Sequence, residues 1–465
     1  MHGRIVIISA SVGAGHDGAA AQLADRLGLL GYEVDRHDFL DLLPARLGAL
    51  LAGSYHHLLT WAPSGYQRIY AATGSTGRPG PAIRPLLRAA ERRTLRAITS
   101  DTVAVISTYP GASQVLGALR RRGLLDVPAL TYLTDFSVHG LWVAPGIDAH
   151  LAAHPIPAAQ AHALGAAGVR VSGPVVDPRF VPGDAETRRL ARLRFGLPAH
   201  TSLALLVAGS WGVGAIRQAA AEIRESGVAV PVVVCGRNEA LAERLRSDGI
   251  DHAFGWIRDM PELMHACDVL VQNAGGLTSL EAFAAGLPTA SYRCIPGHGR
   301  TNAAALQEAG LAAWIRDPAD LKSVLLDLHE GEAGQRQRAQ GLALFTGMRG
   351  PAETIARHCL RPAATVASPI PATSPERATV FAAEYMNRLR TRRTRPATAT
   401  APVPVPSRRT FRRPALVVAA LAFTALLGIG APLAEAYADA PSHFAAVTRF
   451  LEDHDDHEGP QGHVR

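Results

Sequence analysis

Short runs of aliphatic and β-branched residues recur along the first 360 residues, and most are followed by apolar residues at helical spacing. The first run is RIVIIS at 4–9, and the helical pattern after it, 19–30, stops before Gly31. Such a run is typical of a strand buried on both faces. The alternation predicts an α/β fold whose parallel sheets are covered by helices on both sides.

The same alternation occurs twice, which predicts two domains. In the first half the later predicted strands are 33–38, 102–108, 128–135, 149–153 and 169–172, with a helix-rich aromatic region at 39–73. The second series begins with SLALLVAGSWGVGAIRQAAAEI at 202–223 and continues with strands in 231–238, 268–273 and 288–294. We therefore expect two Rossmann-like domains, residues 1–178 and 179–360.

The composition changes after residue 360. Residues 361–413 are rich in Pro, Ala, Thr and Arg and predict a linker without a packed core. Residues 414–434 hold 21 residues without a charge, which is long enough to cross a bilayer, and an acidic tail follows at 435–465. Arginines before this segment place the linker side in the cytoplasm. A buried core helix and a signal-like segment, with a cleavage site near 436–438, are the alternatives.

The charge of the chain narrows the choice of partners. The net charge is +7 with a single lysine, Lys322, so that arginine carries the rest. A basic chain suits an anionic membrane or nucleic acid. Only 6% of residues are aromatic, and aromatics do not alternate regularly with the arginines of the basic stretch 377–413, so the membrane is favoured over nucleic acid. The four cysteines lack paired spacing, which indicates thiols in a reducing compartment and no metal site.

The first glycine turn, residues 11–18 (SVGAGHDG), suggests a nucleotide-binding loop. Gly13, Gly15 and Gly18 match the dinucleotide pattern G-x-G-x-x-G, and Asp35 or Asp38 would supply the acid beyond it. A dehydrogenase therefore stays open at this point. The histidine inside the turn does not suit it, because that turn must bring bare backbone against a pyrophosphate.

His16 is the first candidate for chemistry. It lies near the predicted start of a helix, where the dipole disfavours a cation and leaves a neutral imidazole able to accept a proton. The alternative is a turn histidine with a structural role only.

A second glycine turn lies at 275–278, between a predicted strand and a helix. Backbone N–H groups of Gly275 and Gly276 at a helix start suit a phosphate, and Thr278 adds a hydroxyl. Glu281 follows one turn later, where a carboxylate can accept two ribose hydroxyls. Thr278 and Glu281 also have the spacing of a capping box, which is a structural alternative.

Several segments together resemble the monogalactosyldiacylglycerol synthase and diacylglycerol glucosyltransferase family, relatives of the peptidoglycan lipid-intermediate GlcNAc transferase. They are SASVGAGHDGAA, TYLTDFSVHGLWVAPGIDAHLAAHP, VSGPVVDPRF, VCGRNEAL, GWIRDMPELMHACDVLVQNAGGLTSLEAFAAGLP and PGHGRTNAAAL, in order over about residues 4–315. The resemblance implies a GT-B fold, an acceptor in the first domain, and a UDP-sugar in the second. It also implies inverting transfer with no metal and no cofactor besides the co-substrate.

The resemblance also implies roles for individual residues. On the donor side these are Gly255, Trp256 and Ile257 at the uracil, Gly275, Gly276, Leu277 and Thr278 at the diphosphate, Glu281 at the ribose, and Gly209, Ser210, His298 and Asn302 around the sugar and phosphates. The candidate bases are His16 and Asp135, and the acceptor side includes Gly13, Gly15, Asp17 and His139.

The chain departs from the family pattern in three places. The family's Pro-Gly-Gln-Glu-x-x-Asn reads PGHGRTN at 296–302, so His298 and Gly299 replace the Gln and Glu that would contact sugar hydroxyls. The sugar therefore stays open among galactose, glucose and GlcNAc. Arg300 either reaches a phosphate or is a solvated loop residue. The family's Gly-Gly-Gly-His opening reads Gly-Ala-Gly-His at 13–16, and Asp17 stands where the family often has a basic residue.

We therefore expect a glycosyltransferase on the cytoplasmic face of the cell membrane, which moves a hexose from a UDP-sugar to a lipid such as diacylglycerol. Residues 39–73 and 78–98 either dock on anionic headgroups or cover the sheet as ordinary helices. A UDP-sugar 2-epimerase shares the double-Rossmann architecture. A non-catalytic, membrane-tethered protein that binds nucleotide sugar is the third hypothesis, and the changes at His298 and Gly299 support it.

Overall fold

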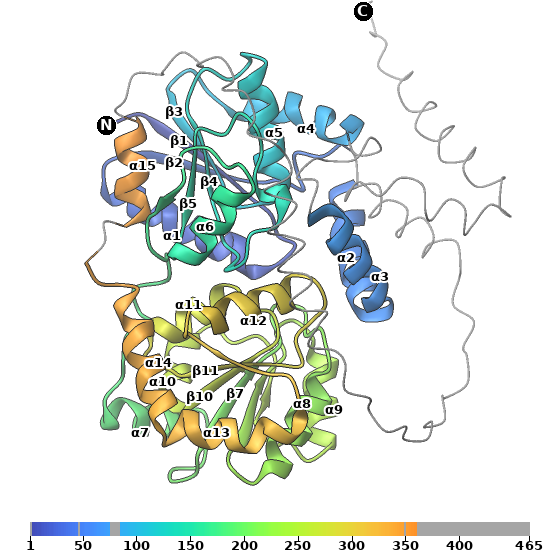
Figure 1. The fold of residues 1–465 in the computed structure, drawn as a ribbon, viewed down its shortest axis with the longest axis vertical. Helices are drawn as coiled ribbons and strands as arrows, with labels where there is room; N and C mark the ends of the chain where they lie inside the picture. The colour runs from blue at the N-terminus through green and yellow to red at the C-terminus, as the bar shows by residue number, and fades with distance from the viewer. Residues whose placement is uncertain (1, 45–46, 75–83, 348–349, 360–465) are drawn as a thin grey trace, which may run out of the picture.

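The computed structural model describes residues 2–44, 47–74, 84–347 and 350–359. Two six-stranded parallel sheets form within this part of the chain, one above the other in Figure 1, so the two Rossmann-like domains expected from the sequence are confirmed. The predicted linker 361–413, apolar segment 414–434 and tail 435–465 lie outside the described residues. Among the helices that are described, none is long and apolar enough to cross a membrane.

The first domain holds strands β1 to β6 in the order β2-β1-β3-β4-β5-β6. The strands are β1 (Arg4–Ser9), β2 (Glu33–Asp38), β3 (Thr102–Ser107), β4 (Ala129–Tyr132), β5 (Ala149–Ala152) and β6 (Arg170–Val171). The helices are α1 (Ala14–Leu29), α2 (Leu47–Trp61), α3 (Pro63–Gly74), α4 (Arg84–Ala97), α5 (Pro110–Arg121), the 3₁₀ turn η1 (Gly140–Trp142) and α6 (Pro155–Ala163).

The second domain holds strands β7 to β12 in the order β12-β11-β10-β7-β8-β9. The strands are β7 (Leu203–Val207), β8 (Val230–Val234), β9 (Ala253–Phe254), β10 (Val269–Gln272), β11 (Thr289–Tyr292) and β12 (Ala313–Ile315). Its helices are α7 (Ala185–Arg194), α8 (Ile216–Ser226), α9 (Glu239–Ser247), α10 (Met260–Ala266), α11 (Leu277–Ala284), α12 (His298–Glu308), η2 (Pro318–Asp320), α13 (Leu321–His329) and α14 (Glu332–Ala343), and the described chain ends with α15 (Pro351–Cys359).

Helix α1 differs most from the prediction, because it begins at Ala14 instead of residue 19. Gly13 is its extended N-cap, so the residues of the glycine turn form the first turn of the helix. The sequence pattern missed β9 and β12, since runs of two and three residues carry no clear alternation.

Alternate residues of β1 fill two apolar layers on opposite faces of the first sheet. Ile5 and Ile7 pack on the side of α1, whereas Val6 and Ile8 pack on the side of α5. This follows from the two-residue period of a strand. All four side chains are at most 1% exposed, which is why the run reads as continuously apolar.

Helix α15 packs on the first domain, although it follows the second domain in the sequence. Ile355 joins the apolar layer of Ile5 and Ile7, and Figure 1 shows the orange helix beside α1. The chain thus crosses between the domains twice, once near residue 178 and once between α14 and α15. Residues 351–359, which the predicted boundary assigned to the second domain, belong spatially to the first.

A buried ion pair joins α7 to the second sheet. Asp268, 4% exposed, accepts hydrogen bonds from Arg192 at 2.8 Å, from Arg188 at 2.6 Å and from the backbone of Leu203 at 2.9 Å. Removing one partner of such a pair leaves an uncompensated buried charge. We expect Asp268→Ala to lower the free energy of unfolding by about 3–5 kcal/mol, measured by urea denaturation.

Asp248→Ala is the matched control, because Asp248 pairs with Arg217 at 2.7 Å on the surface of the same domain. Exposed pairs contribute only ~0–1 kcal/mol. Equal losses in the two variants would show that the burial of Asp268 does not determine its contribution.

Candidate functional site

In each sheet the strand order places one pair of glycine-bearing loops at a topological switch point. In the first sheet β1 leads to β2 on one side and pairs with β3 on the other. In the second sheet β7 lies between β8 and β10 in the same way. The carboxyl ends of strands at a switch point form the usual binding crevice of open α/β sheets. Both predicted glycine turns, after β1 and after β10, lie at these positions.

The imidazole of His16 is oriented by the loop after β3. Its Nδ1 lies 2.8 Å from the carbonyl oxygen of Thr108 and 2.9 Å from the hydroxyl of Thr134. A carbonyl oxygen can only accept, so this contact assigns the proton to Nδ1. The neutral ring therefore presents the lone pair of Nε2, for which no hydrogen bond is found within the described residues. A base held by its second nitrogen is the arrangement expected for proton abstraction.

The second candidate base, Asp135, lies on the loop after β4. Its carboxylate accepts a hydrogen bond from Nε1 of Trp142 at 3.1 Å. The ring of Trp142 in turn lies 6.0 Å from that of His16. Both candidates are half-buried and share this aromatic neighbour, so the structure brings them to the same end of the first sheet.

The second glycine turn, residues 275–278 after β10, leads into α11; we call it the donor turn, after the role that the sequence predicts for it. Gly276 is the N-cap, and no side chain caps the helix there. No atom of the described residues lies within 4 Å of the position that a Cβ of Gly276 would occupy, so this side of the turn is open with respect to them. Thr278 is half-buried in the first turn of the helix. Uncapped N–H groups beside open space can bind an anion.

Glu281 is not part of a capping box, because the N-cap of α11 is Gly276 and not Thr278. The side chain is half-buried, and no hydrogen bond to its carboxylate is found among the described residues. Burial, together with the nearby charge of Asp177, raises the pKa of Glu281 to about 7. A half-buried carboxylate with no protein partner in the described part of the chain is suited to accept hydroxyl groups of a ligand.

The two glycine turns meet across the domain interface. Helices α1 and α11 are in contact, and Figure 1 shows α1 on the side of the first domain that faces α11. A Cβ on Gly18 would lie 2.5 Å from Cδ2 of Leu277, and one on Gly15 would lie 3.6 Å from Cβ of Leu277. A Cβ on Gly13 would meet nothing within 4 Å. The lack of side chains at Gly15 and Gly18 therefore makes room for Leu277 of the second domain. A glycine turn packed against another helix does not fit the role of a dinucleotide-binding loop.

Gly18→Val is expected to separate these helices and lower the free energy of unfolding by about 1–3 kcal/mol, because the added methyl groups overlap Leu277. Gly28→Val in the same helix is the control, since a Cβ at Gly28 meets nothing within 4 Å. Urea denaturation measures both. Adding Leu277→Ala should recover part of the loss in the Gly18 variant only.

His298, which replaces the family's glutamine, lies where α12 meets α3 of the first domain. Its Nδ1 is 3.1 Å from the hydroxyl of Tyr66, and Gln67 accepts the N–H of Gly297 at 2.7 Å. Shielding from water lowers the pKa of His298, and the carboxylate of Asp135 opposes that shift. The ring of His298 therefore lies within electrostatic range of Asp135.

Three predicted residues are engaged with protein instead of facing the cleft. The amide of Asn302 is fully buried and bonded at both ends, to Ser137 and Ala274. His139 caps η1 through Nδ1, and its Nε2 lies 3.0 Å from the carbonyl oxygen of Tyr70. Asp17 accepts the hydroxyl of Ser9 at 2.6 Å. These contacts indicate structural roles and disfavour direct contact with a ligand.

The loops after β7, β8 and β9 bring two tryptophans around one arginine. The guanidinium of Arg237 lies 5.6 Å from the ring centre of Trp211 and 5.3 Å from that of Trp256. Trp256 is 47% exposed, and Gly209 and Ser210 lie on the loop before Trp211. The predicted uracil and donor loops thus share one edge of the second sheet.

The other two residues of the predicted uracil segment lie on either side of Trp256. A Cβ on Gly255 would overlap the carboxylate of Glu239, and Ile257 packs on the core of the second domain. Close approach of Glu239 therefore explains why residue 255 has no side chain.

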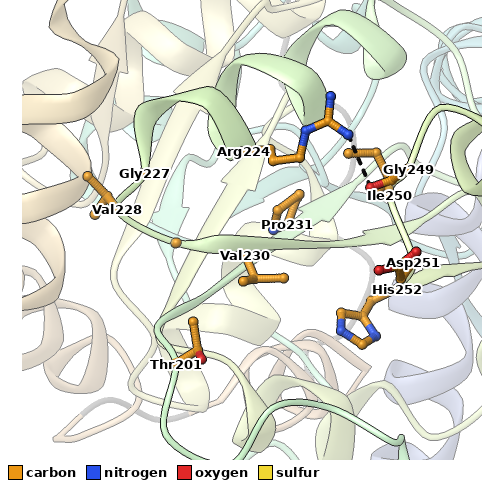
Figure 2. Close-up of a pocket in the computed structure, with 11 residues that line it drawn as sticks. Thr201, Arg224, Gly227, Val228, Val230, Pro231, Gly249, Ile250, Asp251 and His252 are labelled. Atoms are coloured by element: carbon orange, nitrogen blue, oxygen red, sulfur yellow. Dashed lines mark hydrogen bonds between the residues drawn. The ribbon is translucent and has the colours of Figure 1, made fainter.

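A separate depression of about 290 Å³ lies at the opposite edge of the second sheet. It is lined by Thr201, Arg224, Gly227, Val228, Ala229, Val230, Pro231, Gly249, Ile250, Asp251 and His252. Figure 2 shows Arg224 across this depression with a hydrogen bond to Gly249. It lies at the amino ends of β7 and β8, so it is separate from the glycine turns, which follow the carboxyl ends of β1 and β10.

The sequence did not indicate which residues orient His16 or which residue contacts His298. Thr108 and Thr134 orient His16, and Tyr66 of α3 contacts His298. Thr108 ends one predicted strand and Thr134 is next to the last residue of another, so polar side chains near strand ends were the available signal. Nothing in the sequence of α3 indicated a contact with the second domain.

The two parallel-sheet domains with facing glycine turns define the GT-B class of glycosyltransferase folds. The spinosyn rhamnosyltransferase SpnG complexed with thymidine diphosphate is similar, at 14% identity and a TM-score of 0.51 over 76% of this chain and 99% of that one. TcCGT1 in complex with UDP is similar at 11% identity and a TM-score of 0.50, over 83% and 99%. At such identities the likeness shows the fold alone.

Residues 16–176 match the family profile described as monogalactosyldiacylglycerol (MGDG) synthase, and residues 205–330 match glycosyl transferases group 1. The processive diacylglycerol beta-glucosyltransferase of Bacillus pumilus (strain SAFR-032) is 28% identical over 237 residues, 49% of this chain and 61% of that protein. The enzyme of the same description from Bacillus subtilis (strain 168) is 26% identical over 221 residues, 45% and 56%. The family resemblance is confirmed, and the match spans about three fifths of these relatives.

Proposed function

We propose that this protein is a glycosyltransferase that moves a hexose from a UDP-sugar to the hydroxyl of a membrane lipid such as diacylglycerol. The observation that carries the proposal is the facing pair of sites. A histidine with its Nδ1 held by a carbonyl lies on the first domain. On the second lie a helix start without a side-chain cap and the carboxylate of Glu281, which has no hydrogen-bond partner within the described ranges. The descriptions of the diacylglycerol glucosyltransferase relatives support the lipid acceptor.

In this mechanism Nε2 of His16 removes the proton from the acceptor hydroxyl. The hydroxyl oxygen attacks C1 of the sugar from the side opposite the diphosphate, so the configuration at C1 inverts. The bond between C1 and the diphosphate oxygen breaks, and UDP leaves with the electron pair. Asp135 is the alternative base, held by Trp142 at 3.1 Å.

The start of α11 stabilises the departing diphosphate. Backbone N–H groups at Gly276 and Leu277 and the positive end of the helix dipole act where negative charge develops. Glu281 accepts the ribose hydroxyls, and the loop at Trp256 contacts the uracil. The UDP bound to the structural neighbour TcCGT1 supports a nucleotide donor. No metal ion is required in this scheme.

We place the reaction at the cytoplasmic face of the cell membrane, where UDP-sugars and a lipid acceptor meet. A tether through residues 414–434 would raise the local concentration of the catalytic domains near the lipid. The segments 39–73 and 78–98 would dock on anionic headgroups.

The test is incubation of the full chain with vesicles that contain diacylglycerol, with UDP-glucose, UDP-galactose or UDP-GlcNAc in separate reactions. The expected result is UDP release in step with a lipid product heavier by one sugar, at a rate that a metal chelator leaves unchanged. An epimerised UDP-sugar formed without lipid would support the epimerase instead. UDP binding with no turnover on any donor would support the non-catalytic alternative.

A further inference from the structure

The short segment 134–137, which follows β4, contacts both the candidate bases of the first domain and the apolar core of the second domain. Thr134 contacts Nδ1 of His16, and Asp135 accepts from Trp142. The next residue, Phe136, is 4% exposed and joins the apolar core of the second domain. The segment therefore contacts His16 and contains Asp135 at one end, and it packs on the second domain at the other.

Asn302 links this segment to the donor turn. Its Oδ1 accepts the N–H of Ser137 at 2.7 Å and the hydroxyl of Ser137 at 2.8 Å. Its Nδ2 donates to the carbonyl oxygen of Ala274 at 3.0 Å, immediately before Gly275 and Gly276. Asn302 is 0% exposed, so one buried amide spans from the first domain to the donor turn.

The junction is closely packed as well as hydrogen-bonded. Gly275 has a φ of +75°, and a Cβ there would lie 2.7 Å from Cβ of Asn302. The hydroxyl of Ser137 also lies 2.7 Å from the hydroxyl of Thr301. Close packing of this kind leaves the donor turn no room to shift relative to Asn302.

We infer that Asn302 and Ser137 are positioning residues, which set the distance between the base on the first domain and the donor on the second. This inference rests on the proposed function. Asn302 acts through the carbonyl of Ala274, and Ser137 acts through the backbone of the short segment 134–137, whose first residue, Thr134, contacts His16. A displacement of about 1 Å between reacting groups can lower a rate by about 100-fold, so a fixed junction has a direct effect on turnover.

Two conservative variants separate the two ends of this link. Ser137→Ala removes the hydroxyl and keeps the backbone N–H bond, whereas Asn302→Asp keeps the acceptor and removes the donor to Ala274. We expect each variant to lower kcat at least about 10-fold. The affinity for UDP, measured by calorimetry, should stay near that of the unchanged protein. Thr289→Val is the control, because it removes a buried hydroxyl of the second domain, 3.3 Å from the carbonyl oxygen of Leu287.

A second measurement does not depend on turnover. Imidazole ¹⁵N NMR of the full chain, with and without UDP, should show the His16 resonances shifted by Ser137→Ala and unmoved by Thr289→Val. If the unchanged protein transfers no sugar while this shift is present, the proposed function is wrong and the coupling of the two domains stands. Unmoved His16 resonances, or an unchanged kcat in both variants of an active enzyme, would overturn the inference.

Discussion

Replacing His16 with asparagine is expected to lower kcat by about 100- to 10,000-fold, which is the range that a general base contributes. The amide of asparagine can still donate to the carbonyl of Thr108, where Nδ1 of His16 now lies at 2.8 Å. The variant therefore keeps the contact that places the side chain and loses only the proton acceptor Nε2. Steady-state kinetics on diacylglycerol vesicles, with UDP affinity measured in parallel, provide the test.

The two candidate bases are distinguished by comparing His16→Asn with Asp135→Asn. His162→Ala, on the exposed surface of α6, is the control for loss of a histidine and should retain full turnover. If His16→Asn turns over like the unchanged protein while Asp135→Asn does not, the base is Asp135. Full turnover in both variants would rule out the site described here.

Glu281→Ala is expected to raise the KM for the UDP-sugar by about 10- to 100-fold, because hydrogen bonds to a charged group contribute about 1.5–3 kcal/mol. The expectation follows from a half-buried carboxylate that has no protein partner among the described residues. Glu243→Ala, on the exposed face of α9, is the control for loss of a carboxylate. An unchanged donor KM in Glu281→Ala would exclude the ribose role.

The same carboxylate should make donor affinity depend on pH. Its pKa is about 7 in the free protein, raised by burial and by Asp177. The ionised form accepts two hydroxyl hydrogen bonds and the protonated form accepts fewer, so affinity for the UDP-sugar should rise as pH increases from 6 to 8. Calorimetric titrations over this range should show the rise, and Glu281→Gln should give a flat profile if the carboxylate is its source.

The first and second domains illustrate how much of the fold could be predicted. Period and composition predicted β1 and β10, the strands before the two glycine turns, because residues buried on both faces must be apolar whatever surrounds them. They did not predict that α15 returns to the first domain, since its apolar stripe would suit either sheet. The pattern at 275–281 likewise left two hypotheses for Glu281, and the position of the N-cap at Gly276 excluded the capping box.

By itself the sequence determined two parallel-sheet domains, their glycine turns and the presence of a histidine and a carboxylate beside those turns. These follow from local periodicity and from residue chemistry, which are properties of neighbours along the chain. Only the tertiary structure decided that Gly15 and Gly18 admit Leu277, and that Asn302 joins Ser137 to the donor turn. Such roles arise from residues more than a hundred positions apart in sequence, and the packing of one domain on the other brings them together.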